Sequence, residues 1–395
     1  MRILHVMPGV APRYGGPSTA IWPMVAALNR VSGVTAELVA TDADGPGGRV
    51  TADQLPPAAP VHLFPRTRSE QWKYAPALGR WVREHARDYD LLHVHSLWSY
   101  STAAAARAAA RAGVPYVLRP AGMLSEYCLA VRGLKKRVYW AAIEGRTVRR
   151  AAGFHCTGED EVRDVRAVRP GATTYLIPQG IEDAAFAAPA DPDALRRRCG
   201  PAAGNRPIVL FLGRLHPVKG VVDLLLPTFA RVTADAYLAV AGGPDAQAPG
   251  HPAEVRAEID RLGLGDRVGL LGPVAAADRW QLFDGAAAFV LPSHSENFGM
   301  VVAEAMARGC PVVVTEGVQA KAQVLAAGAG RVVRRDPGEL AAVLTDLLAR
   351  PDLRRTLGAA GRDYARTRMS WDTVAAQLVA MYAELTARYP RPAAP

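Results

Sequence analysis

Cysteine is scarce in this chain, and its few copies are scattered. They are Cys128, Cys156, Cys199 and Cys310, among 395 residues. No two of them form a C-x-x-C pair, and no histidines stand beside them at metal-ligand spacing. The sequence therefore predicts reduced thiols, a cytoplasmic location and no metal site, rather than a disulfide framework.

Long apolar runs are missing as well. None approaches the roughly 20 residues that a membrane-spanning helix requires. The amino-terminal MRILHVMPGV reads as a first strand, because proline and glycine follow too soon for a secretory signal. Any membrane contact is therefore expected to be peripheral, at the inner face. The dinucleotide fingerprint G-x-G-x-x-G does not follow this strand, so no cofactor is predicted.

Acidic residues are outnumbered by basic ones, 37 to 47, which gives a formal net charge of +10. The stretch 132–150 holds seven basic residues against one acid, Glu144, with aromatic side chains interleaved. The basic residues are Arg132, Lys135, Lys136, Arg137, Arg146, Arg149 and Arg150. Such a stretch fits an anionic membrane surface, and it fits the solvated face of a helix equally well. Nucleic acid is not an expected partner, because no recognised binding motif accompanies the charge.

Short apolar runs alternate with helix-length segments along the whole chain, as in parallel sheets built from βαβ units. The first set of predicted strands includes 3–7, 36–40, 91–95, 115–118, 154–157 and 175–178. The second set includes 208–213, 237–242, 268–272, 289–292 and 311–314. We therefore predict an α/β protein of two Rossmann-like, doubly wound domains, 1–185 and 200–369, that face one another across a cleft.

The carboxyl end of the predicted strand 289–292 leads into the most informative motif, SENFGMVVAEA. Glu296 precedes a predicted helix, Gly299 marks its start and Glu304 lies within it. Ligands of open α/β sheets bind at the carboxyl ends of strands, and the free N–H groups of a helix N-terminus favour an anion such as a diphosphate. The motif therefore indicates a ligand with both hydroxyls and phosphates.

Two cations follow the predicted strand 208–213 in the segment GRLHPVKG. Arg214 and Lys219 lie five residues apart and can together hold one diphosphate, although either alone would be an ordinary surface residue. The next strand ends in AGGPD, where Gly242 and Gly243 permit close backbone approach to a ligand. Taken alone, the glycine pair would more often be a tight turn.

In the first domain, the opening strand is followed by a loop with two adjacent glycines, Gly15 and Gly16, which let the backbone crowd a ligand. Another strand ends at Arg119 in YVLRPAGML. Arg119 is expected either to meet an acceptor anion or to pair with a carboxylate, for which Glu126 is the nearby candidate.

The segment LLHVHSLWSYS places two histidines on the same face of a strand, with an aromatic residue at its end. A strand histidine is more often a packed, hydrogen-bonded core residue than a catalyst. His95 lies nearer the carboxyl end than His93, so it is the better candidate for contact with an acceptor. Trp98 is predicted to lie beside the same acceptor.

Together these motifs resemble those of the large family of retaining nucleotide-sugar glycosyltransferases with the GT-B fold and an E-x7-E signature. The resemblance covers nearly the whole chain and rests on the glycine loop, RPAGML, IPQG, GRLHPVKG, AGGPD, SENFGMVVAEA and GCPVVVT. It implies transfer of a hexose-type sugar from a nucleotide diphosphate sugar, in polysaccharide, lipopolysaccharide or glycoconjugate biosynthesis. It also implies that the first domain binds the acceptor and that the helix 370–389 packs back on it. On frequency grounds we expect a UDP sugar as the donor, with guanosine diphosphate mannose as the second choice.

The resemblance also implies a role for each matching residue. Arg214 and Lys219 would neutralise the donor diphosphate, and Glu296 would contact the transferred sugar. Glu304 would bind the ribose hydroxyls. Because the two cations do a metal's electrostatic work, no metal ion is implied. The remaining donor contacts would be Gly15, Gly16, Gly243, Asn297, Phe298, Gly299 and Met300.

One position departs from the family pattern. Many relatives carry a histidine where this chain has Ala121, and His95 or Arg119 is then the hypothetical substitute contact. The departure leaves open a non-catalytic nucleotide-sugar-binding subunit or sensor, and a nucleotide-sugar 2-epimerase shares the fold. The acceptor stays open between a lipid-linked glycan and a small molecule.

Overall fold

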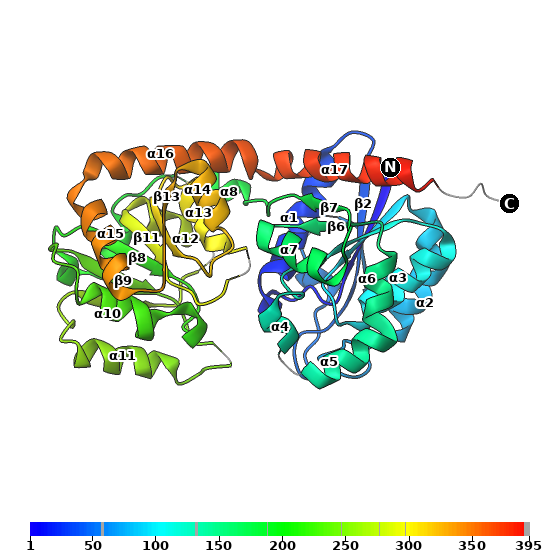
Figure 1. Ribbon diagram of the computed structural model, residues 1–395, viewed down its shortest axis with the longest axis horizontal. Helices are drawn as coiled ribbons and strands as arrows, with labels where there is room; N and C mark the ends of the chain where they lie inside the picture. Colours follow the sequence, from blue (N-terminus) through cyan, green and yellow to red (C-terminus); the bar gives the residue numbers. More distant parts are fainter. Residues whose placement is uncertain are drawn as a thin grey trace. The chain divides into compact units, whose positions relative to one another are not determined.

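The computed structural model describes residues 1–56, 59–130, 133–187, 189–245, 247–275, 277–296 and 298–390. The chain forms two compact units (Figure 1). One consists of Met1–Gly180 and the chain from Trp371 onward, and the other is Ile181–Ser370. Each unit is a parallel sheet with helices on both faces, so the predicted α/β class with two doubly wound sheets is confirmed.

The first unit contains a seven-stranded sheet in the order β3-β2-β1-β4-β5-β6-β7. Its strands are β1 (Arg2–Met7), β2 (Thr35–Thr41), β3 (Val61–Phe64), β4 (Leu91–His95), β5 (Tyr116–Arg119), β6 (Gly153–Cys156) and β7 (Thr174–Leu176). All pairings are parallel, so every strand ends at the same edge of the sheet. The strand order reverses between β1 and β4, and a ligand crevice is expected at that switch point.

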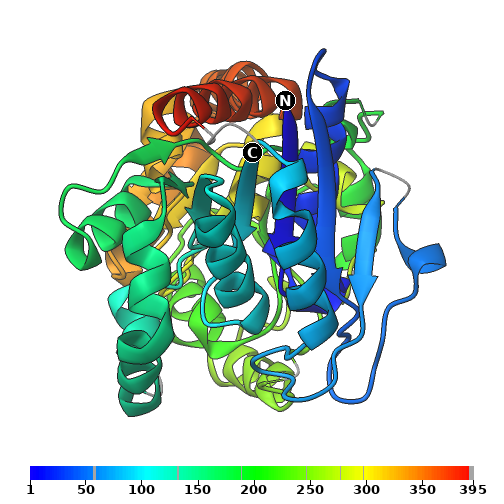
Figure 2. The same ribbon diagram turned by 90° about the vertical axis from the view of Figure 1, so that its right-hand side faces the viewer.

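Helices of the first unit cover the two faces of this sheet. One face packs against α1 (Gly16–Arg30) and α17 (Trp371–Arg388). The other packs against α2 (Pro76–His85), α3 (Tyr100–Ala112), α6 (Gly145–Arg150) and α7 (Glu159–Val168). Figure 2 shows α2, α3 and α6 side by side. Shorter helices are η1 (Pro12–Tyr14), η2 (Ala52–Gln54), η3 (Ala86–Asp88), α4 (Glu126–Ala130), α5 (Gly133–Tyr139) and the π-helical turn η4 (Trp140–Glu144).

The last helix, α17, contributes the apolar stripe that its sequence predicts. Trp371, Val374, Leu378, Met381 and Leu385 are all buried. They share one core with β1, β4, β5 and α1. The terminal helix is therefore part of the first unit, although the whole second unit separates it from that unit along the chain.

The second unit contains a six-stranded parallel sheet in the order β10-β9-β8-β11-β12-β13. Its strands are β8 (Ile208–Leu212), β9 (Tyr237–Ala241), β10 (Val268–Gly272), β11 (Ala286–Leu291), β12 (Val312–Thr315) and β13 (Gly330–Val333). Here the order reverses between β8 and β11, and these two strands precede GRLHPVKG and SENFGM.

The helices of the second unit form two packed groups around its sheet. The first is η7 (Val221–Leu225), α10 (Leu226–Phe229), α11 (His251–Arg261) and α15 (Pro337–Ala349). The second is α9 (Ala194–Cys199), α12 (Arg279–Asp284), α13 (Met300–Ala307), α14 (Lys321–Ala327) and α16 (Pro351–Arg368). The short helices α8 (Asp183–Ala187), η5 (Pro201–Ala203) and η6 (Pro217–Lys219) complete it.

Two strands, β3 and β13, were not among those predicted. Each lies at the edge of its sheet, and β3 is only half-buried along its length. Edge strands need not be apolar on both faces, so VHLF and GRVV lack the continuous apolar signal of the central strands. Within the described part of the chain, no helix combines the length and the apolar character needed to cross a membrane.

Candidate functional site

Backbone strain in the first unit concentrates at one edge of its sheet. Five described non-glycine residues have positive φ: Ser69, Lys73, Ser96, Trp98 and Ala121. All lie in loops that follow β3, β4 or β5 at their carboxyl ends. A left-handed backbone is unfavourable for L-residues, and such conformations gather at functional sites. The strain marks this edge as a candidate site on grounds that do not depend on any sequence motif.

The matching edge of the second unit brings two predicted site residues into direct contact. The Lys219 ammonium group donates to a Glu296 carboxylate oxygen. The loop after β11 is fixed by two backbone bonds, from His294 N to the Val218 carbonyl at 2.8 Å and from Glu296 N to the Gly317 carbonyl at 3.0 Å. The pair therefore lies at the switch point between β8 and β11.

Arg214 pairs with a different carboxylate. Its guanidinium donates to Asp245, a buried residue in the loop after β9, while most of the Arg214 side chain is exposed. The two loops pack closely, because a Cβ on Gly242 would lie 1.7 Å from the Gly213 carbonyl oxygen. Gly243 accepts from Leu215 N at 2.8 Å. The glycine pair thus has a packing role, and Asp245 is a partner that the motif did not reveal.

Helix α13 begins beside Glu296. Gly299 caps it with φ of 71°, and a Cβ there would lie 3.3 Å from Glu296 Cγ. Phe298 is buried, and Met300 is the first helical residue. The N–H groups of this first turn have no partner within the helix and are suited to an anion. Asn297, predicted to contribute an amide here, lies outside the described residues.

Glu304 is buried on α13, and its carboxylate lies 3.4 Å from the Arg279 guanidinium. Arg279 also holds Glu182 at 3.0 Å. Burial raises the pKa of Glu304 to about 7, Arg279 opposes the rise and Glu182 adds to it. A carboxyl group that titrates near neutrality can accept or donate to ligand hydroxyls. Arg279 was missed at the sequence level, because its approach to Glu304 comes from the packing of α12 against α13.

In the first unit, His95 is buried in a cluster of histidines. Its Nε2 lies 2.9 Å from His5 Nδ1, and His93 Nδ1 lies 2.7 Å from the Tyr382 hydroxyl of α17. Burial, with the charge of Arg119 adding to it, lowers the pKa of His5 to about 3. The pKa of His95 is also far below its ordinary value, chiefly through burial. These imidazoles are neutral, and His95, the last residue of β4, is a packed, hydrogen-bonded residue at the carboxyl edge of the sheet.

Nitrogen atoms of His5, His93 and His95 lie within 4.8 Å of one another, a spacing that a metal ion could use. The sequence concealed this group, because His5 and His93 are far apart along the chain and are brought into register by the pairing of β1 with β4. The positive charge of buried Arg119 acts on these histidines. It opposes a cation, so the cluster is better suited to a neutral hydrogen-bonded network.

Arg119 is itself buried and donates to the Gln179 amide oxygen. Its charge is balanced by Glu161 rather than by Glu126. Glu161 in turn accepts from Gly122 N at 2.6 Å and from Thr157 N at 2.7 Å. The loop that carries Ala121 is therefore anchored from below by Glu161.

The glycine loop after β1 is open. A Cβ on either Gly15 or Gly16 would meet nothing within 4 Å in the structure, so packing does not explain these glycines. Beside them the Tyr14 hydroxyl donates to Glu70, and Lys73 Nζ lies 2.9 Å from Glu70 and 3.6 Å from the centre of the Tyr14 ring. Burial lowers the pKa of Lys73, and Glu70 opposes that effect. The sequence gives no local motif for this polar group. In the structure, the positive φ of Lys73 marks it.

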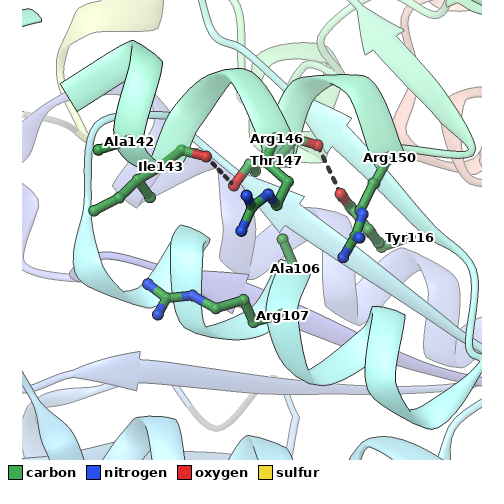
Figure 3. Close-up of a pocket in the computed structure, with 8 residues that line it drawn as sticks. All are labelled: Ala106, Arg107, Tyr116, Ala142, Ile143, Arg146, Thr147 and Arg150. Carbon is green, nitrogen blue, oxygen red and sulfur yellow. Dashed lines mark hydrogen bonds between the residues drawn. The ribbon is translucent and has the colours of Figure 1, made fainter. Parts of the chain in front are cut away.

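A hollow of about 120 Å³ lies between α3 and α6 (Figure 3). Three arginines line it, Arg107, Arg146 and Arg150. At its floor the Tyr116 hydroxyl donates to the Thr147 carbonyl at 2.6 Å. Tyr116 is the first residue of β5, so the hollow lies toward the amino end of that strand and away from the carboxyl edge.

Two family models match consecutive parts of the chain. Residues 15–180 match the glycosyl transferase 4-like domain, and residues 196–364 match glycosyl transferases group 1. Together the two segments take in most of the chain.

Curated relatives align over a shorter length. A D-inositol 3-phosphate glycosyltransferase of Xylanimonas cellulosilytica is 36% identical over 226 residues, covering 55% of this chain and 52% of that protein. The enzyme of the same name from Geodermatophilus obscurus is 34% identical over 217 residues, covering 53% and 47%. The alignments thus span about half the length of these relatives.

Solved structures match the fold over nearly the whole chain. HepE of Anabaena, solved in complex with UDP, superposes with a TM-score of 0.78 at 22% identity, covering 97% of this chain and 100% of that one. Sucrose-phosphate synthase from Thermosynechococcus elongatus superposes with a TM-score of 0.72 at 22% identity, covering 98% and 99%. Both are similar in fold.

Proposed function

Because this chain belongs to the group 1 glycosyltransferases, we propose that it transfers a hexose-type sugar from a nucleotide diphosphate sugar to an acceptor hydroxyl, with retention of anomeric configuration. The observation that carries the proposal is the meeting of Lys219, Glu296 and the start of α13 at the switch point of the second sheet. This arrangement offers positive charge to a diphosphate and a carboxylate to sugar hydroxyls within one crevice.

In this proposal the donor lies along the second unit. Its diphosphate meets Lys219, Arg214 and the first-turn N–H groups of α13. Its ribose hydroxyls meet Glu304, whose carboxylate Arg279 holds in place. Glu296 then leaves Lys219 to the phosphate and contacts the hydroxyls of the transferred sugar. HepE of Anabaena was solved with UDP and with UDP-glucose, which supports UDP as the donor nucleotide.

The reaction breaks the bond between the anomeric carbon and the phosphate oxygen, and forms one from that carbon to the acceptor oxygen. Negative charge develops on the leaving diphosphate, where each preorganised donor is commonly worth about 3 kcal/mol. The acceptor attacks from the face that the phosphate leaves, and the leaving phosphate oxygen takes the acceptor's proton. Since Arg214, Lys219 and α13 supply the positive charge, the proposal needs no metal ion.

The acceptor side of the proposal is the strained edge of the first unit, beside Trp98 and the loop of Arg119 and Ala121. Gly15 and Gly16 are the proposed contacts of this unit to the donor's phosphates, and in the described part of the chain no sequence-distant atom lies within 4 Å of a Cβ placed on either. The curated relatives are named for transfer to an inositol phosphate, which supports a phosphorylated acceptor. We place the product in polysaccharide, lipopolysaccharide or glycoconjugate biosynthesis.

We further propose that the protein works in the cytoplasm and binds peripherally to an anionic membrane surface. The continuous helical run of α5, η4 and α6 carries six described cations, while its one acid, Glu144, is buried. Two apolar residues on α5, Leu134 and Val138, are 77% and 64% exposed. Arg132, predicted to belong to the same basic stretch, lies outside the described residues. Exposed apolar side chains among cations favour the interface of an anionic bilayer.

The test is release of nucleoside diphosphate from a panel of nucleotide sugars, with and without a membrane extract. We expect one donor to be turned over, faster with extract, and release to fall about 100-fold in both Glu296→Ala and Arg214→Ala. Arg368→Ala, an exposed arginine of α16, is the matched control and should match the wild type. Binding of a donor without release under any condition would instead support a non-catalytic sensor, and sugar inversion at C2 without transfer would support an epimerase.

A further inference from the structure

A cavity of about 610 Å³ lies beside Trp98, between α4, α5 and η4 in the first unit. Its walls are mainly apolar: Trp98, Leu129, Leu134, Trp140 and Val168. The rings of Trp98 and Trp140 are 5.9 Å apart, and Trp98 is fixed by a bond from its Nε1 to the Met123 carbonyl at 3.2 Å. The cavity therefore has a rigid aromatic wall, and that wall stands at the carboxyl end of β4.

The polar residues of the cavity are mostly cationic. Lys136 and Arg137 line it with one acid, Glu126. Lys136 donates to the Cys128 carbonyl, and its Nζ lies 5.4 Å from the centre of the Trp98 ring. Arg137 is exposed, and no ion pair of this residue is found within the described ranges. The charged lining of the cavity is therefore two cations against one acid, which gives it a net positive charge.

The apolar lining continues out of the cavity onto the surface. Leu134 lines the cavity and is yet 77% exposed, the largest exposure of the large hydrophobic residues described. Val138, four residues on and so on the same side of α5, is 64% exposed. Exposed apolar surface that continues into a hollow marks a binding site for an apolar group. A soluble sugar phosphate would leave these walls unused.

We propose that this cavity binds the hydrocarbon chain of a lipid-phosphate acceptor, with Lys136 and Arg137 receiving its phosphate. The inference rests on the proposed function, and it narrows the acceptor to an amphipathic phosphate. The chain would lie between Trp140 and Leu134, and the glycan end would reach past Trp98 toward the strained edge of the sheet.

Binding of monomeric alkyl phosphates to the full chain tests the proposal. Butyl, octyl and decyl phosphate would be titrated below their micelle concentrations, with inorganic phosphate and 1-octanol as single-feature probes. Each buried CH₂ should improve the affinity about four-fold, up to the length that fills the cavity. Tryptophan emission should shift on binding, because Trp98 and Trp140 form the wall. An affinity that does not depend on chain length overturns the proposal.

Two exposed substitutions locate the site without threatening the fold. Leu134→Ser should weaken decyl phosphate at least about ten-fold, because the leucine covers several methylenes. Leu325→Ser, at a leucine of α14 that is 62% exposed, is its control. Arg137→Ala should lower the affinity for the alkyl phosphates but not for 1-octanol. Arg368→Ala should change neither affinity. Equal effects of target and control variants would overturn the assignment.

Two further measurements separate this inference from the others. The first is partition of the protein onto phosphatidylglycerol vesicles. If the protein binds the vesicles but not monomeric alkyl phosphates, it adsorbs to the surface only, and the cavity site is overturned. Nucleoside diphosphate release is followed in the same variants. If the wild type releases nucleoside diphosphate but does not bind alkyl phosphates, the cavity site is wrong and the proposed function stands. If alkyl phosphates bind with the expected dependence on chain length but no nucleoside diphosphate is released, the proposed function is wrong and the cavity site stands.

Discussion

The ammonium group of Lys219 contacts the carboxylate of Glu296, a residue 77 positions further along the chain. The side chains are only 12% and 22% exposed, so neither charge is fully solvated. A donor diphosphate would compete with Glu296 for Lys219. In the proposed function, donor binding would therefore exchange one anion for another at Lys219, and the carboxylate released would be the one proposed to receive the sugar.

Loss of the Lys219 side-chain charge should lower the affinity for the donor more than it lowers the stability of the fold. In Lys219→Met we expect the affinity for UDP-glucose to fall by about ten- to 100-fold, because a charge-assisted contact to phosphate is lost. Titration calorimetry would measure it, with Lys135→Met on α5 as the control. Because Glu296 competes with the donor phosphate for Lys219, Glu296→Gln should raise the affinity for UDP while it lowers release. Equal loss of UDP affinity in both variants would contradict the exchange.

The ionisation of Glu304 should make donor affinity depend on pH. Its pKa in the free protein is raised to about 7, and the ionised form is the stronger acceptor for ribose hydroxyls. Affinity should therefore rise with pH, by about ten-fold between about pH 6 and pH 8, as the competent fraction grows. UDP-glucose is the suitable probe, since it has no group that titrates in this range. Glu304→Gln should bind with a flat pH profile, and a slope that survives in this variant would assign the effect elsewhere.

Glu144 should make the protein less stable as pH rises. Burial raises its pKa from 4.5 to about 7, and a backbone hydrogen bond from Trp98 opposes the rise. Because the folded state holds the proton more tightly, the stabilisation is present below the unfolded pKa and is lost as pH rises through the folded one. The loss amounts to about 3 kcal/mol.

Glu144→Gln removes this ionisation but leaves that of Glu304. The difference in stability between the variant and the wild type therefore reports on Glu144 alone. We expect the variant to gain stability relative to the wild type as pH rises from about 4.5 to about 8. Urea unfolding at both ends of the range would measure the difference. A difference that stays constant with pH would mean that Glu144 is not the titrating group.

A substitution at Gly16 should change activity without changing the stability of the fold. A methyl group at this position would meet no atom within 4 Å, and the backbone there is not left-handed. Gly16→Ala should therefore change the free energy of unfolding by less than about 0.5 kcal/mol. Nucleoside diphosphate release should nevertheless fall, since the added methyl occupies space proposed for the donor. Gly180→Ala is the opposite case, because its methyl would lie 2.3 Å from the Trp371 ring, and it should lower the melting temperature.

The parts of the fold that could be predicted are those with a local signal. The central strands are mainly apolar, and β8 is wholly so, because helices cover both of their faces. The apolar stripe of α17 repeats at helical spacing. The edge strands β3 and β13 lack that burial, so they lack the signal.

The candidate site divides in the same way. Lys219 and Glu296 stand in motifs whose spacing after a strand already indicates an anion site. The partners of Arg214 and Glu304 could not be predicted in this way, because Asp245 reaches Arg214, and Arg279 reaches Glu304, only through tertiary packing. The buried group around His5 is likewise made by strand register rather than by sequence proximity.

The division of the first unit along the chain has a consequence for synthesis. The second unit is one uninterrupted segment, whereas the first lacks α17 until residues 371–388 have been synthesised. Until then the face of β1 and β4 that Trp371 and Tyr382 cover remains exposed. The carboxyl-terminal unit can therefore reach its native state before the amino-terminal one, the reverse of the usual order. A chain truncated before Trp371 and released would hold a complete second unit and an incomplete first, and its open apolar face would be a target for chaperones.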